Sequence, residues 1–322
     1  MKNNQAVTAT AVPSPLLKKK KGKKLKQYLP LYLMLIPGGI YLLINNYLPM
    51  AGLALAFKKV NYSVGLLKSP WCGLTNFTYL FKSKDIFLIF RNTILYNLAF
   101  IILGNLFSII VAIALDCIRS KFFKRFSQIT ILIPYLLSTV IVSYIVFAFL
   151  SPSNGFLNNT ILPLIGINPI KWYNEAQYWP PILVFVYLWM SLGYSSILYY
   201  STLIGIDKTY YEAAVVDVAS TWDQIIHITL PSLKTTIITL VLLAVGRICY
   251  SDFGLFYQVP MHSGLLYSTT QTIDTYVYRA LLELNDIGRS SASGFLQSIL
   301  GFFCVLGANS LVNKLDKDSA LF

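Results

Sequence analysis

Residues 207–231 read DKTYYEAAVVDVASTWDQIIHITLP and lie between two long apolar stretches. The segment carries four of the chain's 13 acidic residues, although charged residues make up only 12% of the chain. A polar connection between apolar stretches of this length is typical of a loop at a membrane surface. The loop therefore indicates an α-helical membrane protein with a substantial structure outside the lipid.

Capping residues predict how this loop folds. Asp207 is a favourable helix N-cap, so we expect one short helix over 208–216. Ser220 and Asp223 form a capping-box pattern, which predicts a second helix that begins at 221. Pro231 is expected to end that helix before the next apolar stretch.

The composition of the whole chain agrees with a membrane protein. Of the 322 residues, 56% are hydrophobic, and the mean hydropathy is +0.61. A soluble protein carries about 25% charged residues, so the low charge excludes a disordered or coiled-coil protein and argues against a soluble enzyme. No metal site or zinc spacing is expected, because the four cysteines are far apart and the only histidines are His227 and His262.

Charge-free stretches mark the membrane spans. The charge-free stretch 126–170 is too long for one span and breaks at the turn cluster 151–155. Residues 264–289 are long enough to span but too polar, so we place them outside the membrane. The prediction is an all-α polytopic protein with six spans, near 31–52, 92–115, 127–150, 181–203, 232–252 and 291–313.

The basic residues set the expected orientation. The net charge is +13, and a run of lysines from Lys18 to Lys26 abuts the first apolar stretch, as cytoplasmic flanks of membrane helices do. This run lacks the interleaved aromatics of a nucleic-acid surface, so no nucleic-acid partner is expected. We predict a disordered cytoplasmic tail over 1–26, a transmembrane domain over 27–317 with its loop at 204–231, and a tail over 318–322. Both termini are expected in the cytoplasm of a multi-pass protein.

The loop resembles the EAA loop of ATP-binding-cassette (ABC) importer permeases, whose pattern is E-A-A, three residues, G, nine residues, I-x-L-P. The residues in register are Glu212, Ala213, Ala214, Ile228, Leu230 and Pro231, with Asp217 five residues after the glutamate. Val218 stands where the family has glycine. A β-branched residue does not easily adopt a positive φ, so we expect either another turn geometry, with Ser220 restarting the helix, or a different docking of the loop.

Two further matches point to a branch of that family. Residues 73–77 read GLTNF and are similar to the G-L-x-N-F segment of sugar permeases, and Asn92-Thr93 is similar to their N-T. Together the matches run from about residue 31 to 313. They look most like the oligosaccharide and polysaccharide branch of maltose-type permeases, which implies a bacterial cell-membrane protein and a carbohydrate substrate.

The resemblance implies partners, because the chain itself has no G-x-x-x-x-G-K-[ST] phosphate-binding loop. The expected partners are two ATP-binding subunits, which would hold ATP and Mg, a second homologous permease in a heterodimer, and an extracellular solute-binding protein. No cofactor and no catalytic residue is therefore expected in this chain, which is not predicted to be an enzyme. The coupling residues carried over are Glu212, Ala213, Ala214, Asp217, Ile228, Leu230 and Pro231.

A sugar path needs aromatic faces and hydrogen-bonding groups within the membrane. By match to the family, the expected path residues are Gly193, Tyr194, Ser196, Ser251 and Asp252, and Tyr250 is added because its ring could offer a face to a sugar. Two alternatives stay open. In the first, Arg247 and Asp252 have no role in the path and simply extend their charged groups toward water from a helix end. In the second, the partner permease is the subunit that holds the sugar.

Other classes of protein fit less well. An intramembrane serine protease needs a nucleophile turn with a histidine in another span, and both histidines lie in expected loops. A glycosyltransferase needs clustered acids for a metal, and only Asp217 and Asp223 qualify. A permease for an amino acid, a peptide or phosphate would share the EAA loop, but the long expected outer loops at 57–91 and 253–289 favour a sugar.

Overall fold

The computed structural model describes residues 21–66, 68–82 and 85–315; most of them are helical, and no strand is found among them. The all-α prediction is therefore confirmed for the described residues. Part of the expected tail, residues 1–20, and the residues 316–322 lie outside the described chain. Helix α1 begins at Lys21, so its first turns include the last residues of the segment expected to be a tail. The chain forms two compact units, one ending at Gly52 and one beginning at Leu53.

The first unit is a single helical path. It comprises α1 (Lys21–Leu42), a π turn η1 (Leu43–Tyr47) and α2 (Leu48–Met50), and the 3-10 helix η2 (Ala51–Phe57) continues into the second unit. The stretch Tyr28–Phe57 is long and apolar enough to cross a membrane. Every side chain from Tyr28 to Met50 is exposed in this chain, which suits a helix solvated by lipid.

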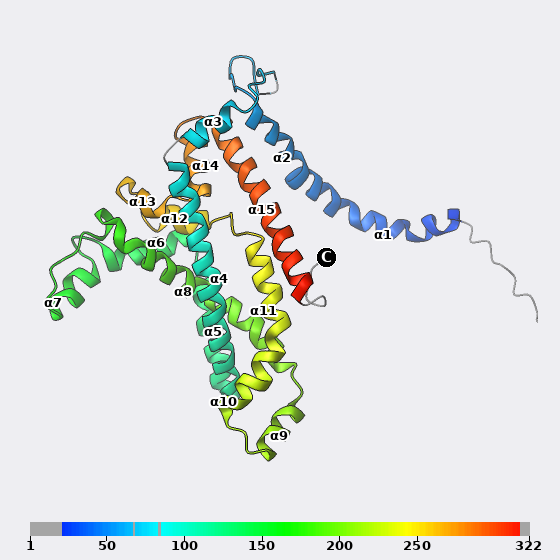
Figure 1. Ribbon diagram of the computed structural model, residues 1–322, viewed down its shortest axis with the longest axis vertical. Helices are drawn as coiled ribbons and strands as arrows, with labels where there is room; N and C mark the ends of the chain where they lie inside the picture. The colour runs from blue at the N-terminus through cyan, green and yellow to red at the C-terminus, as the bar shows by residue number, and fades with distance from the viewer. Residues whose placement is uncertain (1–20, 67, 83–84, 316–322) are drawn as a thin grey trace, which may run out of the picture. The chain divides into compact units, whose positions relative to one another are not determined.

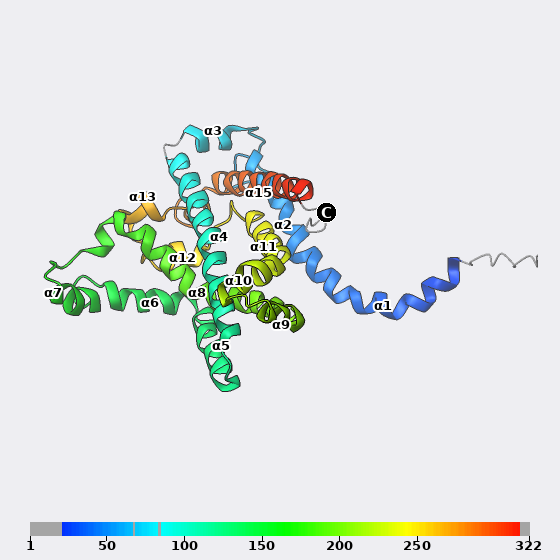
Figure 2. The same cartoon turned by 60° about the horizontal axis from the view of Figure 1, so that its bottom comes forward.

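The second unit holds the remaining helices (Figure 1). They are α3 (Thr75–Lys82), α4 (Asp85–Cys117), α5 (Lys121–Leu136), α6 (Thr139–Leu150), η3 (Leu157–Ile161), α7 (Leu162–Leu164), η4 (Trp172–Asn174), η5 (Ala176–Tyr178), α8 (Trp179–Ile204), α9 (Lys208–Val216), α10 (Thr221–Gln224), η6 (Ile225–Thr229), α11 (Leu230–Val245), α12 (Phe253–Gln258), η7 (Gly264–Leu266), α13 (Tyr267–Thr270), α14 (Ile273–Leu282) and α15 (Ile287–Leu315). Figure 1 shows α9 and α10 at the end of this unit away from α3, and Figure 2 shows the cartoon turned so that this end comes forward.

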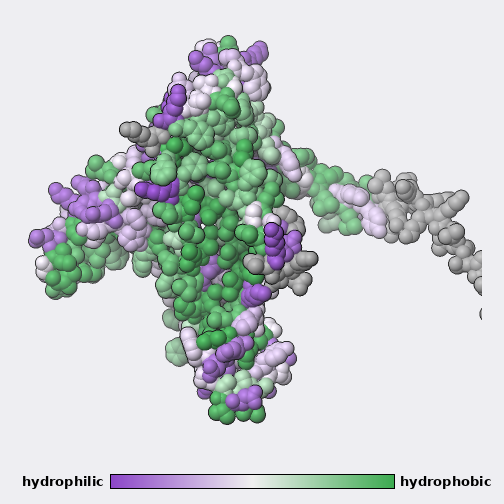
Figure 3. All heavy atoms as spheres, viewed as in Figure 1, coloured by the Kyte–Doolittle hydropathy of each residue, from purple (hydrophilic) through white to green (hydrophobic). Residues whose placement is uncertain are grey.

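Five described helices are long and apolar enough to cross a membrane, and the bent pair α5–α6 makes six when it is counted as one span. Figure 3 shows hydrophobic side chains over the middle of the second unit and hydrophilic ones toward its ends. A surface of this kind matches a bilayer, whose hydrocarbon core is about 30 Å thick.

The third expected span, 127–150, is not one helix. Helix α5 ends at Leu136 and α6 begins at Thr139, and the two are bent by 95°. Leu137 has extended backbone angles, and the Ser138 side chain accepts a hydrogen bond from the Val140 N–H at 3.4 Å, so Ser138 starts a new helix. Hydropathy is continuous across this point, which is why the sequence pattern missed the bend.

The fifth expected span, 232–252, is displaced toward the N-terminus. The helix runs from Thr221 to Val245, and residues 246–252 are not helical apart from tight turns. Pro231 does not end the helix as predicted. It follows the π turn η6, whose wider hydrogen-bonding pattern accommodates a residue that has no N–H.

Buried side chains join α4 to α8 along most of their length. One cluster, around Tyr96, Phe100 and Leu183, also includes α6 and α12. A second cluster, around Tyr199 and Leu233, joins the same two helices to α11. At Gly193 of α8, a Cβ atom would lie 1.9 Å from the Ile131 carbonyl oxygen of α5, so only glycine allows this approach.

The segment 73–77 and the Asn92-Thr93 pair have structural explanations. Gly73 has φ 62, and the Asn76 amide donates to the carbonyls of Ala56 and Lys58 at 2.8 and 3.0 Å. Asn92 donates to the carbonyls of Ser268 and Gln271, and Thr93 accepts from the Ile273 N–H at 3.0 Å. These two motifs therefore anchor the loops around α3 and before α14.

Candidate functional site

Both helices predicted within the loop at 207–231 are present. The Asp207 side chain accepts the Thr209 N–H at 3.0 Å, and α9 follows over Lys208–Val216. Ser220 and Asp223 exchange capping hydrogen bonds at 3.0 and 3.2 Å, and α10 begins at Thr221. Hydrogen bonds from Thr209 lower the pKa of Asp207, so its carboxylate is charged at neutral pH. The capping predictions are confirmed.

Val218 adopts the backbone conformation that the family's glycine would have, with φ 58. Its N–H donates to the Val215 carbonyl at 3.1 Å, and the Ala219 N–H donates to the Ala214 carbonyl at 2.9 Å. This pair of bonds is a Schellman motif. The expectation of another turn geometry is therefore wrong, and the helix end is closed at a local strain of about 1–2 kcal/mol.

A hydrogen bond ties α9 to the helix that enters the bundle. The Tyr211 hydroxyl lies 3.0 Å from the hydroxyl of Thr229, which is buried. The Gln224 side chain also donates to the Ala219 carbonyl at 3.3 Å. These bonds join α9 to the last residue before α11, and α10 to the turn that precedes it.

The outer face of this loop is unusually apolar. Val216 is 81% exposed, Val218 90% and Trp222 67%. Beside them, Glu212 lies in an open depression with Lys208 and Tyr211. The coupling residues expected from the sequence lie as follows: Glu212, Ala213, Asp217, Leu230 and Pro231 are exposed, and Ala214 and Ile228 are partly buried. Exposed apolar groups around a carboxylate are typical of a surface that another protein covers.

A cavity of about 680 Å³ lies between α4, α8, α11 and the non-helical segment 246–252. Its wall carries polar and aromatic side chains at the depth of the membrane helices. They are Asn97 and Asn105 from α4, Tyr187, Ser191, Tyr194 and Ser195 from α8, and Arg247, Tyr250, Ser251 and Asp252 after α11. Cavities of this size suit small ligands, and several of these groups form hydrogen bonds.

Side chains from other helices satisfy the backbone of the segment 246–252. The Asn97 amide donates to the carbonyls of Ile248 and Tyr250 at 3.0 and 2.9 Å. The Gln297 amide of α15 donates to the Cys249 carbonyl at 2.9 Å. Irregular backbone at membrane depth is stable only where it is satisfied in this way or lines a wet cavity, and this segment does both.

Asp274 of α14 fixes one end of the same segment. It accepts the N–H and the hydroxyl of Ser251 at 2.6 and 2.8 Å, and it also accepts from Gln297. Asp252 has a different role, because its side chain caps α12 by accepting the Leu255 N–H at 3.0 Å. Among the described residues, no ion pair joins Asp252 to Arg247.

The structure brings together four of the six residues expected on a sugar path. Tyr194, Tyr250, Ser251 and Asp252 line the cavity. Gly193 and Ser196 do not. Gly193 packs against α5, and Ser196 is fully buried with its hydroxyl bonded to the Gly193 carbonyl at 3.0 Å.

Sequence reasoning missed the contribution of α4. Asn97 and Asn105 lie in an otherwise apolar stretch, and polar side chains within a span are a recognised signal of function. Tyr199 donates to the Asn105 side chain, and Tyr187 stacks on Phe100 with ring centroids 3.8 Å apart. The asparagines were visible in the sequence, but their pairing with α8 and with residues 246–252 was not.

Comparison with known proteins places these features in context. Residues 104–317 match the family model described as "Binding-protein-dependent transport system inner membrane component". Protein LplB of Bacillus subtilis (strain 168) is 34% identical over 89% of this chain and 90% of its own length. The polygalacturonan/rhamnogalacturonan transport system permease protein YteP of the same organism is 33% identical over 96% of this chain and 97% of its own length.

Solved structures show the same fold. A chain of a bacterial ABC transporter involved in the import of the acidic polysaccharide alginate aligns with a TM-score of 0.85 and 30% identity, covering 92% of this chain and all of that one. A chain of a bacterial alginate ABC transporter in complex with an alginate pentasaccharide-bound periplasmic protein aligns with a TM-score of 0.84 and 30% identity, covering 93% of this chain and 99% of that one.

Proposed function

The chain belongs to the family of binding-protein-dependent transport system inner membrane components, and from that premise we propose that it conducts an oligosaccharide or polysaccharide fragment as the permease subunit of an ABC importer. The observation that carries the proposal is the cavity at membrane depth. Hydroxyl, amide and phenol groups line it, and a sugar needs such hydrogen-bonding partners when it leaves water.

The comparisons support a carbohydrate over other solutes. YteP is named a polygalacturonan/rhamnogalacturonan transport system permease, and the transporter of the first solved structure is involved in the import of alginate; both align with this chain over most of their length. Stacked aromatic pairs also lie beside the cavity, with Tyr135 and Tyr194 centroids 4.8 Å apart. An amino-acid or phosphate permease would have less use for a cavity of this size.

We propose that the importer contains an extracellular solute-binding protein, a second homologous permease and two ATP-binding subunits that hold ATP and Mg. The comparison with a transporter bound to a periplasmic protein supports the first partner. The apolar face around Val216, Val218 and Trp222 supports a subunit docked on the loop at 207–231. In this proposal the loop and both termini lie on the cytoplasmic side of the membrane.

The proposed mechanism is mechanical. Closure of the ATP-binding subunits would push on α9 through Glu212 and the exposed valines. The Tyr211–Thr229 bond would pass the movement to α11, whose far end carries the segment 246–252. Helix movement at one end of a rigid bundle then opens or closes the cavity at the other.

Substitution of Glu212 tests this function. In the reconstituted importer, Glu212→Ala should lower transport and sugar-stimulated ATP hydrolysis, while the affinity for the solute-binding protein is unchanged. Glu175→Ala, at the opposite end of α8, is the matched control and should leave both rates unchanged. Wild-type rates in Glu212→Ala would refute the coupling role, and an importer that no oligosaccharide stimulates would refute the carbohydrate assignment.

A further inference from the structure

Arg247 is a charged residue at membrane depth. It lies in the segment 246–252, whose carbonyls at Ile248 and Tyr250 accept hydrogen bonds from the Asn97 amide of α4. Asn97 is 12 residues from the nearer end of this 33-residue helix, or about 18 Å at 1.5 Å per residue. The helix is about 50 Å long, so only about 10 Å at each end extends beyond a hydrocarbon core of about 30 Å. Arg247 therefore lies within the thickness of the membrane, where an arginine is costly unless water or an anion reaches it.

The guanidinium of Arg247 has no partner within the described part of the chain. Neither an ion pair, nor a side-chain hydrogen bond, nor an aromatic ring beneath the group is found there. Other arginines are held in place. Arg91 donates to the Asn92 side chain at 3.1 Å. Arg279 and Arg289 lie over tyrosine rings, at 3.9 and 4.9 Å from the ring centres. Arg247 is exposed and lines the cavity of about 680 Å³, so its N–H donors are available to a molecule that enters.

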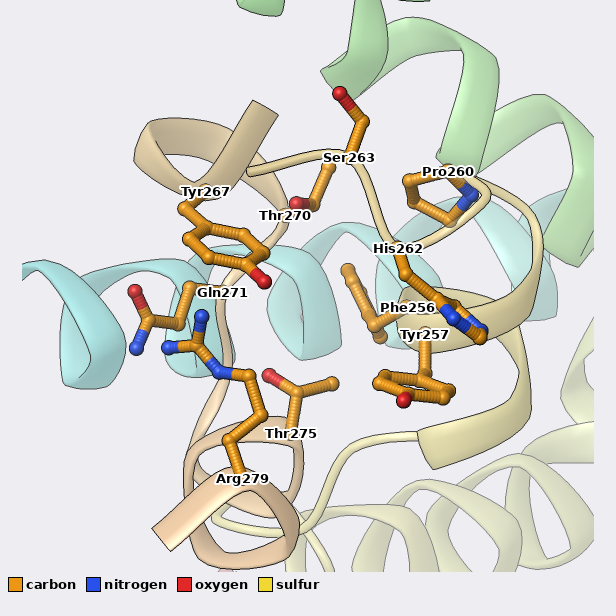
Figure 4. A pocket seen from close by; sticks show the side chains of 10 residues that line it. All are labelled: Phe256, Tyr257, Pro260, His262, Ser263, Tyr267, Thr270, Gln271, Thr275 and Arg279. Atoms are coloured by element: carbon orange, nitrogen blue, oxygen red, sulfur yellow. The ribbon is translucent and has the colours of Figure 1, made fainter. Parts of the chain in front are cut away.

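Arg279, on α14, has no such access. Figure 4 shows it in a small pocket, with its guanidinium against Tyr267 and beside Gln271. The volume of that pocket is about 10 Å³, which holds one water and no larger group. One water also suffices for the buried Nε atom of Arg279. A sugar in the cavity therefore meets Arg247 and does not meet Arg279.

Asp252 is the one acidic side chain among the described residues that line the cavity, and it does not neutralise Arg247. Its carboxylate accepts the Leu255 N–H at 3.0 Å, which holds it at the start of α12. The cavity thus presents a positive and a negative group that are separate from each other. A uronic acid is the complement of this pair, because its carboxylate accepts from a guanidinium fork and its hydroxyls donate to a carboxylate. A neutral sugar would use the negative group alone.

We propose that Arg247 binds the carboxylate of a uronic acid in the transported oligosaccharide and so gives the importer a preference for acidic over neutral sugars; this inference rests on the proposed function. The volume of the cavity lies in the range of ligand sites, so a sugar ring has room beside the guanidinium. Tyr194, Ser195 and Tyr250 on the same wall offer ring faces and hydroxyls to the rest of the molecule. An uncharged sugar of the same shape would have to leave the guanidinium to water.

Titration of the assembled importer, in phosphatidylcholine nanodiscs and without its solute-binding protein, tests the site with trigalacturonate and its uncharged methyl ester. The wild type should bind the acid at least about tenfold more tightly, as expected for charge-assisted hydrogen bonds. Arg247→Gln should reduce the preference to within about twofold without weakening the ester. Arg247→Lys keeps the charge and loses the fork, so its preference should fall between these two. Lys171→Gln is the matched control, because Lys171 is also exposed and basic but does not line the cavity, and it should keep the wild-type preference.

Five results would overturn the site. Three concern the preference: equal binding of acid and ester by the wild type, an unchanged preference in both Arg247 variants, or an equal loss of preference in Lys171→Gln, which would indicate a long-range field. Loss of the permease heterodimer in both Arg247 variants would assign the guanidinium to an acid of the partner permease. Loss of the preference in phosphatidylglycerol nanodiscs would assign it to a lipid phosphate.

Sugar-stimulated ATP hydrolysis, measured in the same preparations with the solute-binding protein added, reports on the proposed function separately. If oligosaccharides stimulate hydrolysis while the wild type shows no preference for the acid, only the site at Arg247 fails. If no oligosaccharide stimulates hydrolysis, the proposed function fails as well.

Discussion

The hydroxyl of Tyr211 lies 3.0 Å from the hydroxyl of Thr229, across the turn that separates α9 from α10 and η6. Thr229 is buried directly before α11, so this bond joins the largely exposed helix α9 to the bundle interior. Without it, α9 would be connected to α11 mainly through the strained turn at Val218. The bond is therefore a direct side-chain link between α9 and the start of the helix that borders the cavity.

Removing this link should impair coupling before it impairs folding. Tyr211→Phe deletes one hydroxyl, and the lost hydrogen bond is worth about 1 kcal/mol. We expect transport and sugar-stimulated ATP hydrolysis to fall several-fold while the subunits still assemble. Tyr210→Phe is the matched control, because Tyr210 is 64% exposed. Equal rates of transport and ATP hydrolysis in Tyr211→Phe and Tyr210→Phe would show that the bond has no role in coupling.

Replacing Val218 by glycine should stabilise the chain. The left-handed conformation strains valine by about 1–2 kcal/mol, and glycine loses about 0.5–1 kcal/mol of that gain through its greater freedom when unfolded. No packing is lost, because Val218 is 90% exposed. The thermal midpoint of Val218→Gly should therefore rise slightly. In contrast, Val216→Gly places glycine within α9 and should lower the thermal midpoint. A lower midpoint for Val218→Gly would mean that the valine side chain is needed at the turn.

The caps of α9 and α10 were predictable because capping is local chemistry. Asp207 and Ser220 each bond to backbone groups two or three residues away. The conformation of Val218 ran against its local preference, so it was not predictable from propensity. The expectation of another turn geometry followed that preference and was wrong, and the two Schellman hydrogen bonds explain why valine accepts the left-handed conformation.

The cavity was only partly predictable, because distant residues build it. Tyr250, Ser251 and Asp252 were expected near a sugar path, but they were placed at the end of a helix. The segment is not helical because Asn97 and Gln297, on two other helices, satisfy its carbonyls. Ser196 was misplaced for a different reason. It lies two residues after Tyr194, and residues with that spacing point to different faces of an α-helix, so Ser196 is fully buried while Tyr194 lines the cavity.

Asn97 should be necessary for the non-helical segment. Asn97→Leu keeps the side-chain size but leaves the carbonyls of Ile248 and Tyr250 without their donor, at about 1–3 kcal/mol each. We expect a lower thermal midpoint and faster hydrogen exchange over 246–252. Asn105→Leu is the control, since Asn105 bonds to Tyr199 and to its own helix and makes no contact of this kind. An unchanged exchange rate in Asn97→Leu would show that the segment is held by its other contacts.

Accessibility to a hydrophilic thiol reagent should separate the residues that line the cavity from those that pack behind it. On a background without the native Cys72, Cys117, Cys249 and Cys304, the variants Tyr250→Cys and Asp252→Cys should react, and bound oligosaccharide should protect them, because both positions line the cavity. Ser196→Cys should stay unreactive, since Ser196 is fully buried behind Gly193. An acid within the membrane costs about 2.5–3.5 kcal/mol on insertion scales, and Asp252 offsets part of this cost by capping α12 through the Leu255 N–H, so labelling tells whether water also reaches its position. Absence of labelling at 250 and 252 in both the resting and the ATP-bound importer would place these side chains in a dry interior and move the sugar site to the partner permease.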